Sequence, residues 1–340
     1  MELKSVIQKL VYAAGASGAE TEIAKVCMEL LTPYGKPYMD ALGNVCCTME
    51  GNGKYHVHLD AHMDEIGLCV IEICDGFIKT AACGGIDRRV MDGVEVLVHG
   101  KETLFGVVTS IPPHLQKNAE DKKLSEEILI DMGLPKEKLE SLVSLGDRVT
   151  IKPQMKTLLN DCISAPALDD RAGIASLLVA AEELSKIEKQ DRPDVTFVFS
   201  TREETTESGA KTAAYHVDAD YVIAVDVSFA ATPDAKPEAC GKLHEGVMIG
   251  YAPSLTFARS KQMEALAKEN KIPYQVEVMG EGTGTNCDVM GMERGGRESA
   301  LLSIPLRYMH TGIEVIALED LRNTGLLLSK AVLKGADATC

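Results

Sequence analysis

Histidine and carboxylate residues recur where apolar segments of this chain end. His62 and Asp64 lie two residues apart at the end of KYHVHLDAHMD, so their side chains project to one side of a strand. A metal-binding histidine usually donates its second ring N–H to an oxygen, and Asp64 is placed to accept it. The pair alone proves little, because a His-x-Asp sequence is more often structural.

Two acidic pairs follow. Asp169 and Asp170, in ALDDRAGIAS, stand just before a helix whose apolar face begins at Ala172. Aspartate is a favoured N-cap, so capping alone would explain them. Glu203 and Glu204 end the apolar segment VTFVFST. Consecutive side chains on a strand diverge, so one can face a metal and its neighbour a substrate, although a solvated strand end would also explain them.

Two single residues complete the set. Asp226 lies inside the apolar segment YVIAVDVS, where a carboxylate is costly unless it is paired or bound to a metal. His310 follows SIPLRY, which has the composition of a buried strand. All five segments lie at or beside the C-terminal ends of predicted strands, and open α/β sheets bind ligands at that edge.

The elements that must hold these residues alternate between helix and strand. Helical apolar spacing covers 4–13 and 19–33, and two strands follow in DALGNVCCTMEG and KYHVHLDAHMDEIG. After Pro166 the alternation runs through RAGIASLLVAAEELSKIEK, VTFVFST, YVIAVDVS, SKQMEALAKENKI and SALLSIPLRY. This pattern predicts a mostly parallel sheet with helices on both faces.

The segment 67–160 has a different sequence pattern. It contains short β-like runs separated by glycine, aspartate and proline: LCVIEI, FIKTAAC, VEVLVHG, LFGVVTSI and DRVTIKP. One helix is predicted between 123 and 143. We therefore expect a small β-rich domain at 67–160, inserted into an α/β domain formed by 1–66 and 161–340.

Composition excludes several classes of function. The net charge of −16 without a basic stripe argues against a nucleic-acid partner. No stretch is long enough to span a bilayer, and the N-terminal sequence has no apolar core of a secretory signal. The ten cysteines show neither zinc-site nor disulfide-framework spacing, so we expect reduced thiols in a cytoplasmic protein.

Taken together, the residues resemble the glutamyl and tetrahedral aminopeptidases, metallopeptidase family forty-two, some of which carry a cellulase label. The resemblance spans nearly the whole chain, through GASGAETEI, DALGNV, AHMDEIG, GGID, IPPHL, GDRV, LDDR, AVDV and IPLRYMH. It implies a metal-dependent aminopeptidase with two divalent cations in each subunit. Zinc is the first expectation, and cobalt or manganese would also suit a set of three carboxylates and two imidazoles.

The resemblance also implies individual roles. Asp169 would bridge the two cations, Glu203 would be the general base, and Asp64 would support the first histidine. The implied metal ligands are His62, Asp169, Glu204, Asp226 and His310.

The fold that the resemblance implies is a three-layer α/β/α peptidase domain, of the phosphorylase/hydrolase-like kind, with an inserted β-barrel-like domain at 67–160. In the family that insert mediates dimerisation, and the dimers commonly build a dodecameric shell. Peptide substrates, a homo-oligomer and a cytoplasmic location are therefore expected.

Two segments depart from the family pattern. Relatives usually read QEEVGxRGA where this chain has REETTESGA (202–210), and GGGTDA where it has GEGTGTNCDVM (280–290). The preferred N-terminal residue therefore stays open. The alternatives are a dipeptidase or acyl-amino-acid hydrolase on the same scaffold, and a catalytically altered protein that keeps only the shell. A glycosidase would need two carboxylates flanking a sugar and not a histidine-containing metal set.

Overall fold

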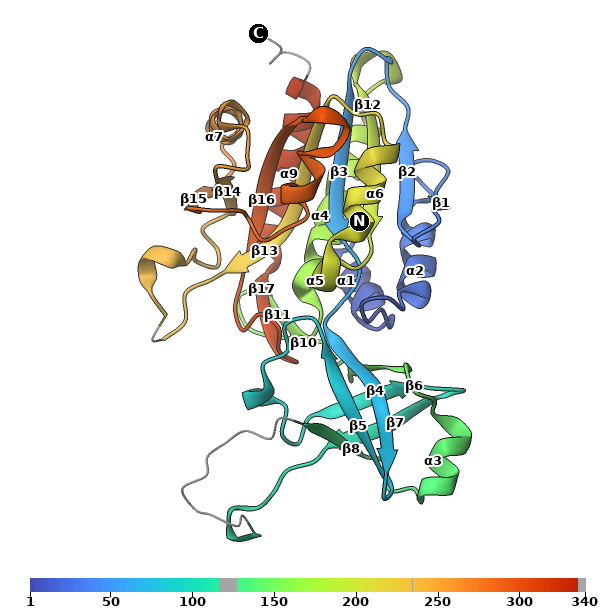
Figure 1. Cartoon of the computed structure of the whole chain (residues 1–340). Coiled ribbons are helices and arrows are strands. Elements are labelled where there is room, and N and C mark those ends of the chain that lie inside the picture. The colour runs from blue at the N-terminus through green and yellow to red at the C-terminus, as the bar shows by residue number, and fades with distance from the viewer. Residues whose placement is uncertain (116–126, 234, 336–340) are drawn as a thin grey trace.

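A twisted sheet between two layers of helices forms the larger part of the computed structural model, which describes residues 1–115, 127–233 and 235–335 (Figure 1). Its strand order is β1-β2-β12-β3-β13-β16-β14-β15, and the four central strands are parallel. The three-layer α/β/α fold predicted from the sequence is confirmed. The strands are β1 (Tyr38–Met39), β2 (Val45–Met49), β12 (Asp194–Ser200), β3 (His56–His62), β13 (Tyr221–Phe229), β16 (Glu298–Leu306), β14 (Val247–Tyr251) and β15 (Tyr274–Val278).

The parallel strands end along one edge of the sheet. His62 is the last residue of β3 and pairs with Ser200, the last residue of β12. These strands are buried on both faces, which explains their nearly continuous apolar sequences. Asp226 near the end of β13 and His310 just after β16 therefore reach the same edge as His62.

Helices cover both faces of the sheet. On one face α4 and α9 lie side by side against the sheet, together with α1, α2 and α7. On the other face α6 and α8 pack against the central strands. The helices are α1 (Leu3–Val11), α2 (Thr21–Leu31), α4 (Leu168–Ser185), α5 (Glu203–Thr206), α6 (Ser208–His216), α7 (Phe257–Asn270), α8 (Cys287–Met290) and α9 (Leu318–Lys334).

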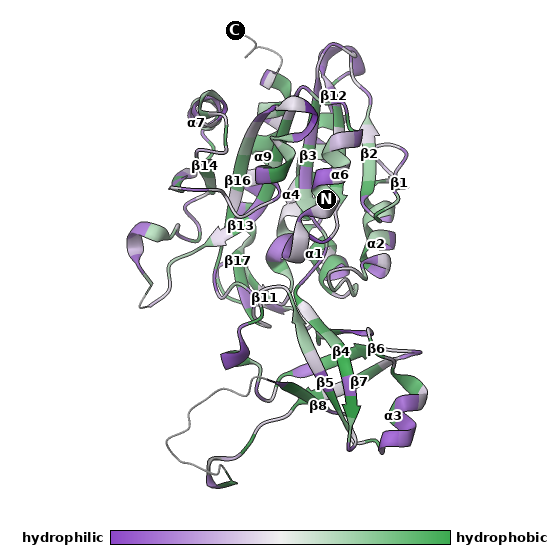
Figure 2. Ribbon diagram, viewed as in Figure 1, coloured by the Kyte–Doolittle hydropathy of each residue, from purple (hydrophilic) through white to green (hydrophobic). Residues whose placement is uncertain are grey.

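A small closed barrel projects from the C-terminal edge of the sheet, below it in Figure 1. Its order is β4-β5-β8-β7-β6-β9, all pairs are antiparallel, and its core is separate from that of the sheet. In Figure 2 the strands are largely hydrophobic, whereas α3 is mostly hydrophilic. Its elements are β4 (Gly67–Cys74), β5 (Phe77–Cys83), β6 (Glu95–His99), β7 (Thr103–Val108), β8 (Ile128–Asp131), α3 (Lys136–Leu142) and β9 (Arg148–Ile151).

The barrel confirms the β-rich insert, while the domain boundaries at 66/67 and 160/161 stay a prediction. The single helix predicted at 123–143 is wrong in its extent: Ile128–Asp131 form β8, and only Lys136–Leu142 are helical. The backbone of β8 pairs with β5 on one edge and with β7 on the other, and every second side chain enters the barrel core. Gly133, at φ 66°, turns the chain before the helix. Residues 123–126 lie outside the described part.

A three-stranded antiparallel sheet connects the barrel to the larger sheet. It contains β10 (Lys156–Thr157), β11 (Cys162–Ala165) and β17 (Glu314–Ala317), with β11 in the middle. The end of β11 leads directly into α4, and β17 follows the segment that carries His310. This small sheet therefore holds the start of α4 beside the chain after β16.

Nine cysteines in the described segments are free thiols, and five of them are buried, whereas Cys340 lies outside those segments. No helix in the described segments combines the length and apolar character needed to cross a bilayer.

A buried ion pair fixes the N-terminal segment to the site. The Arg171 side chain, fully buried at the start of α4, donates to Glu65 Oε1 at 3.3 Å and to the carbonyl oxygens of Leu10 and Ala13. Glu65 Oε1 also accepts the Gly15 amide at 3.0 Å. One guanidinium thus connects α1, the residues after β3, and α4.

Replacing Arg171 with methionine should destabilise the fold by about 3–5 kcal/mol, because Glu65 would stay buried without its partner. Urea unfolding followed by circular dichroism would measure the loss. The double variant Arg171→Met/Glu65→Gln should recover part of it. Equal unfolding midpoints for the single variant and the parent protein would contradict this role of the pair.

Candidate active site

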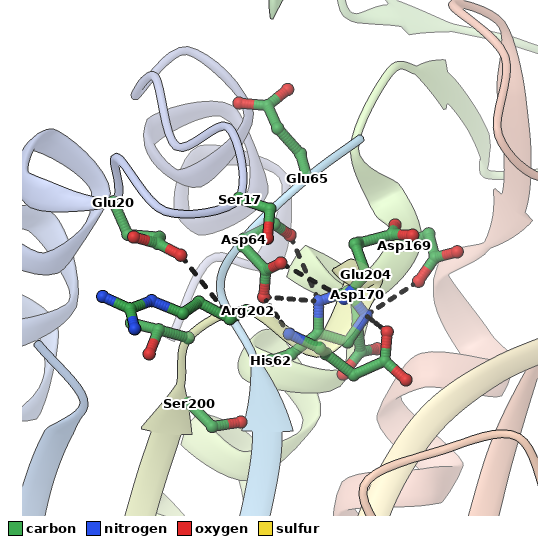
Figure 3. A network of polar contacts seen from close by, with 12 residues as sticks. Ser17, Glu20, His62, Asp64, Glu65, Asp169, Asp170, Ser200, Arg202 and Glu204 are labelled. Atoms are coloured by element: carbon green, nitrogen blue, oxygen red, sulfur yellow. Dashed lines mark hydrogen bonds and ion pairs between the residues drawn. The ribbon is translucent and has the colours of Figure 1, made fainter. Parts of the chain in front are cut away.

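The acidic and histidine residues singled out in the sequence meet at the C-terminal edge of the parallel strands. Figure 3 shows His62, at the end of β3, among Asp64, Asp169, Asp170 and Glu204. Glu203, Asp226 and His310 lie within the same group, since each has an atom within 4.0 Å of another member. All seven residues that the sequence analysis assigned to the site are therefore brought together.

Asp169 lies between the two histidines. Its Oδ1 is 3.0 Å from Nε2 of His62, and its Oδ2 is 3.2 Å from Nε2 of His310. Nε2 of His310 is also 3.4 Å from a carboxylate oxygen of Glu204. Each oxygen of this carboxylate thus faces a different imidazole, as the two oxygens of a bridging ligand would face two sites.

Backbone carbonyls fix which ring nitrogen each histidine turns toward this carboxylate. Nδ1 of His62 lies 3.1 Å from the carbonyl oxygen of Asp64, and Nδ1 of His310 lies 3.0 Å from that of Gly85. A carbonyl only accepts, so both Nδ1 atoms donate and both Nε2 atoms face the cluster. The sequence predicted the Asp64 carboxylate as the partner of His62, but that carboxylate is farther away, at 3.5 Å.

The Asp64 carboxylate instead positions the paired glutamates. It accepts the backbone N–H of Glu203 at 3.0 Å and that of Glu204 at 3.3 Å. Because these residues begin the short helix α5, one carboxylate orients both glutamates. Their side chains diverge: the Glu203 carboxylate lies 3.8 Å from His62, whereas Glu204 reaches His310.

Asp170 and Asp226 form a second group with His62. Asp226 Oδ1 is 4.0 Å from His62 Nε2, and donor atoms of all three residues lie within 4.8 Å of one another. Asp170 also caps α4, because its Oδ1 accepts the Gly173 amide at 2.9 Å. A Cβ at Gly173 would lie 2.2 Å from the other oxygen of Asp170, so glycine leaves room for this carboxylate.

Glu314 is a buried site residue that the sequence analysis missed. Its Oε2 accepts the amides of Leu168 and Asp169, and its Oε1 accepts the amide of His310 at 2.8 Å. Glu314 therefore positions the backbone of two central members of the cluster. The available signal was a lone glutamate at the start of EVIA, an otherwise apolar strand.

Burial governs the ionisation of the cluster. It raises the pKa of Glu203 to about 9, of Glu204 to about 10 and of Asp226 to about 7, with neighbouring carboxylates adding to the shift. Burial would also raise the pKa of Asp169, but hydrogen bonds with the two imidazoles outweigh it and lower this pKa below its usual value. Such carboxylates stay ionised together only where positive charge stands among them.

Divalent cations fit this donor set. Oδ2 of Asp170 and Oε1 of Glu204 are buried without a hydrogen-bond partner among the described atoms. The described residues lining the adjoining cavity include no lysine or arginine. Besides the group with Asp170 and Asp226, donor atoms of His62, Asp169 and Glu204 also lie within 4.8 Å of one another.

Strained backbone conformations surround the cluster. Ala167, Arg202 and His310, none of them glycine, have φ between 56° and 61°. Ala167 precedes the aspartate pair, and Arg202 precedes the glutamate pair. Residues in this region persist where the surrounding contacts compensate for the strain, and they concentrate at functional sites.

The cluster opens into a cavity of about 940 Å³. Residues from both segments that depart from the family pattern line it: Thr205, Thr206 and Glu207 from one, and Thr283, Gly284 and Thr285 from the other. The departures therefore lie where a substrate would contact the protein.

Comparison with known proteins gives one consistent family. The sequence model described as M42 glutamyl aminopeptidase matches residues 43–327. The lysyl aminopeptidase of Pyrococcus furiosus is 31% identical over 338 residues, which cover 97% of this chain and 96% of the relative. A protein of Acetivibrio thermocellus described as a putative aminopeptidase is 32% identical over 344 residues, or 97% and 98% of the two chains.

Solved structures agree with this result. A TET aminopeptidase from a marine sediment Thaumarchaeota archaeon superposes with a TM-score of 0.92 at 28% identity, covering 98% of this chain and 96% of the other. The TET1 peptidase of Pyrococcus horikoshii gives a TM-score of 0.86 at 28% identity, covering 97% and 99%. With a family match over most of its length, this chain belongs to the M42 family of metal-dependent aminopeptidases and is a peptide hydrolase.

Proposed function

We propose that the protein removes N-terminal amino acids from peptides with the help of two divalent cations. The observation that carries the proposal is the Asp169 carboxylate, whose two oxygens face Nε2 of His62 and Nε2 of His310. Asp169 would be shared between the two sites. The residues of the first site would be His62, Asp169 and Asp226, and those of the second Asp169, Glu204 and His310.

The bound cations would polarise the scissile carbonyl and lower the pKa of the attacking water. Zinc, cobalt and manganese all suit carboxylate and imidazole donors, and zinc is our first expectation. The protein supplies the fixed donor geometry: Glu314 and Asp64 hold the backbone of the ligands, and two carbonyl groups set the histidine tautomers.

Glu203 is the proposed general base. Its carboxylate is nearly buried, lines the cavity and lies 3.8 Å from His62 Nε2. From this position it would accept a proton from the attacking water and pass it to the leaving amine. The neighbouring Glu204 carboxylate points toward His310 instead, where it would bind the second cation.

Restriction to the N-terminus would follow if one of the cations held the free α-amino group of the substrate, because an acylated amine is a poor ligand. A dipeptidase or an acyl-amino-acid hydrolase on the same scaffold would instead depend on a free carboxylate or an acylated amine. A catalytically altered shell protein is the other alternative, and the changed segment 202–210 favours it.

We also propose a homo-oligomer, with dimers formed through the barrel domain at 67–160 and a dodecamer as the complete assembly. The support is likeness: the Pyrococcus horikoshii relative is described as assembling into a tetrahedron or a large octahedral shell. A cytoplasmic location, suggested by the free thiols, stays a prediction from the sequence.

The metal-loaded protein should cleave aminoacyl-p-nitroanilides with a free amine and leave N-acetylated versions intact. Glu203→Gln should lower kcat roughly 100- to 10,000-fold, because the base is lost while the ligands remain. Rates and bound metal, the latter by inductively coupled plasma mass spectrometry, would be measured together. Glu269→Gln, on the exposed end of α7, is the control.

Unchanged kcat in Glu203→Gln at full metal content would remove Glu203 from its role. Faster cleavage of the acetylated substrates would favour the acyl-amino-acid hydrolase. No cleavage of any substrate by protein with two bound cations would favour the silent shell.

Glu314→Gln should weaken metal retention by roughly 10- to 100-fold, because an amide nitrogen would replace one oxygen that accepts a ligand backbone N–H. Competition with a chelating dye would give the affinity, and near-ultraviolet circular dichroism would show that the fold is kept. Metal affinity equal to that of the parent protein, with an intact fold, would show that Glu314 does not position the ligands.

Light scattering at neutral pH should give a mass near twelve times the 36.6 kDa chain. Removing residues 67–160 is too drastic a test of the barrel. Hydrogen exchange at subunit concentrations that dissociate the assembly should instead show protection lost within the barrel. A monomer at all concentrations would overturn the assembly proposal.

A further inference from the structure

The cavity beside the cluster has a second anionic feature that no proposed metal ligand accounts for. Glu277, on the edge strand β15, reaches over the sheet toward β16 and β13 and lines the cavity. Its Oε2 accepts the Ser303 hydroxyl at 3.0 Å, and its Oε1 accepts the Ser228 hydroxyl. Two hydroxyl groups thus hold this carboxylate in one place.

The Glu277 carboxylate lies close to the proposed reaction centre. Ser228, which it contacts, is two residues after Asp226 on β13 and therefore on the same face, roughly 7 Å further along the strand. A residue whose α-amino group lay at the cluster could extend a side chain over this distance. The flexible stem of lysine, about four carbons long, is suitable.

The rest of the cavity suits such a side chain. Met248 and Met279 supply apolar wall that a methylene stem would cover, while Glu207 and Glu238 add negative charge. A cavity wall without lysine or arginine, over the described lining residues, offers no partner for an acidic side chain. The cavity therefore combines apolar walls with fixed negative charge.

We propose that this cavity selects peptides whose N-terminal residue is lysine or arginine, with Glu277 as the residue that pairs with the cationic side chain. This inference rests on the proposed aminopeptidase function. The family is described as glutamyl aminopeptidase and one relative as lysyl aminopeptidase, so family membership alone does not set the preferred N-terminal residue. The negative charge of the cavity favours a lysyl over a glutamyl side chain.

The test compares kcat/KM of the metal-loaded protein for lysyl, arginyl, leucyl and glutamyl p-nitroanilides. The parent protein should prefer lysyl over glutamyl substrate by at least about 100-fold, since the contact with Glu277 changes from attraction to repulsion. Glu277→Gln keeps the shape and a hydroxyl acceptor, and it should lower the lysyl-to-leucyl ratio roughly 10- to 100-fold. The change should appear mainly in KM, because the contact does not involve the reacting atoms and is made equally in the ground state and the transition state.

Glu281→Gln is the matched control. It removes the same charge four residues away, at an exposed position outside the cavity lining, and should leave the lysyl-to-leucyl ratio and the rates unchanged. A ratio that stays constant in Glu277→Gln, or that falls equally in Glu281→Gln, would overturn the inference. A preference of the parent protein for glutamyl substrate would do the same.

Calorimetric binding of L-lysinamide and L-isoglutamine separates this inference from the proposed function. Tighter binding of lysinamide that Glu277→Gln weakens would support the selectivity even if no substrate were cleaved, and in that case the aminopeptidase proposal alone would fail. Equal binding of the two amides would overturn the selectivity, whereas cleavage of leucyl substrate would still support the aminopeptidase.

Discussion

The carboxylate of Asp169, buried between the imidazoles of His62 and His310, is the contact on which the arrangement of the site depends. Several other carboxylates are buried around it, and mutual repulsion would drive them apart unless positive charge stood among them. Hydrogen bonds to the backbone hold the ligand-bearing segments in place against this repulsion. Glu314 accepts the amides of Asp169 and His310, and Asp64 accepts the amide of Glu203. These bonds also stabilise the strained positive-φ conformations in the same segments.

The barrel contributes to this constraint as well as extending the molecule. The carbonyl oxygen of Gly85, after the last residue of β5, fixes the tautomer of His310, and a Cβ at this glycine would lie 2.6 Å from the imidazole. The insert and the α/β domain therefore build the second histidine's position together. If subunits associate through the barrel, a shift of the barrel on association would move the Gly85 carbonyl and with it the His310 imidazole.

The sequence predicts those strands whose apolar composition follows from burial on both faces of the sheet. The apolar strands that carry His62 and Asp226 were predicted because their residues are buried on both faces. The helix at 123–143 was wrong because β8 is stabilised by long-range pairing, which a local pattern does not show. Glu314 and Glu277 were missed for the same reason: their partners lie on other elements, and only the folded chain brings them together.

Anomalous X-ray diffraction from crystals soaked in zinc would show whether Asp169 is shared between two cations. We expect two zinc peaks in each subunit, one on either side of the Asp169 carboxylate. Coordination of the first by His62 and of the second by His310 would establish the shared ligand. A single peak, or peaks that do not contact Asp169, would contradict the two-metal arrangement.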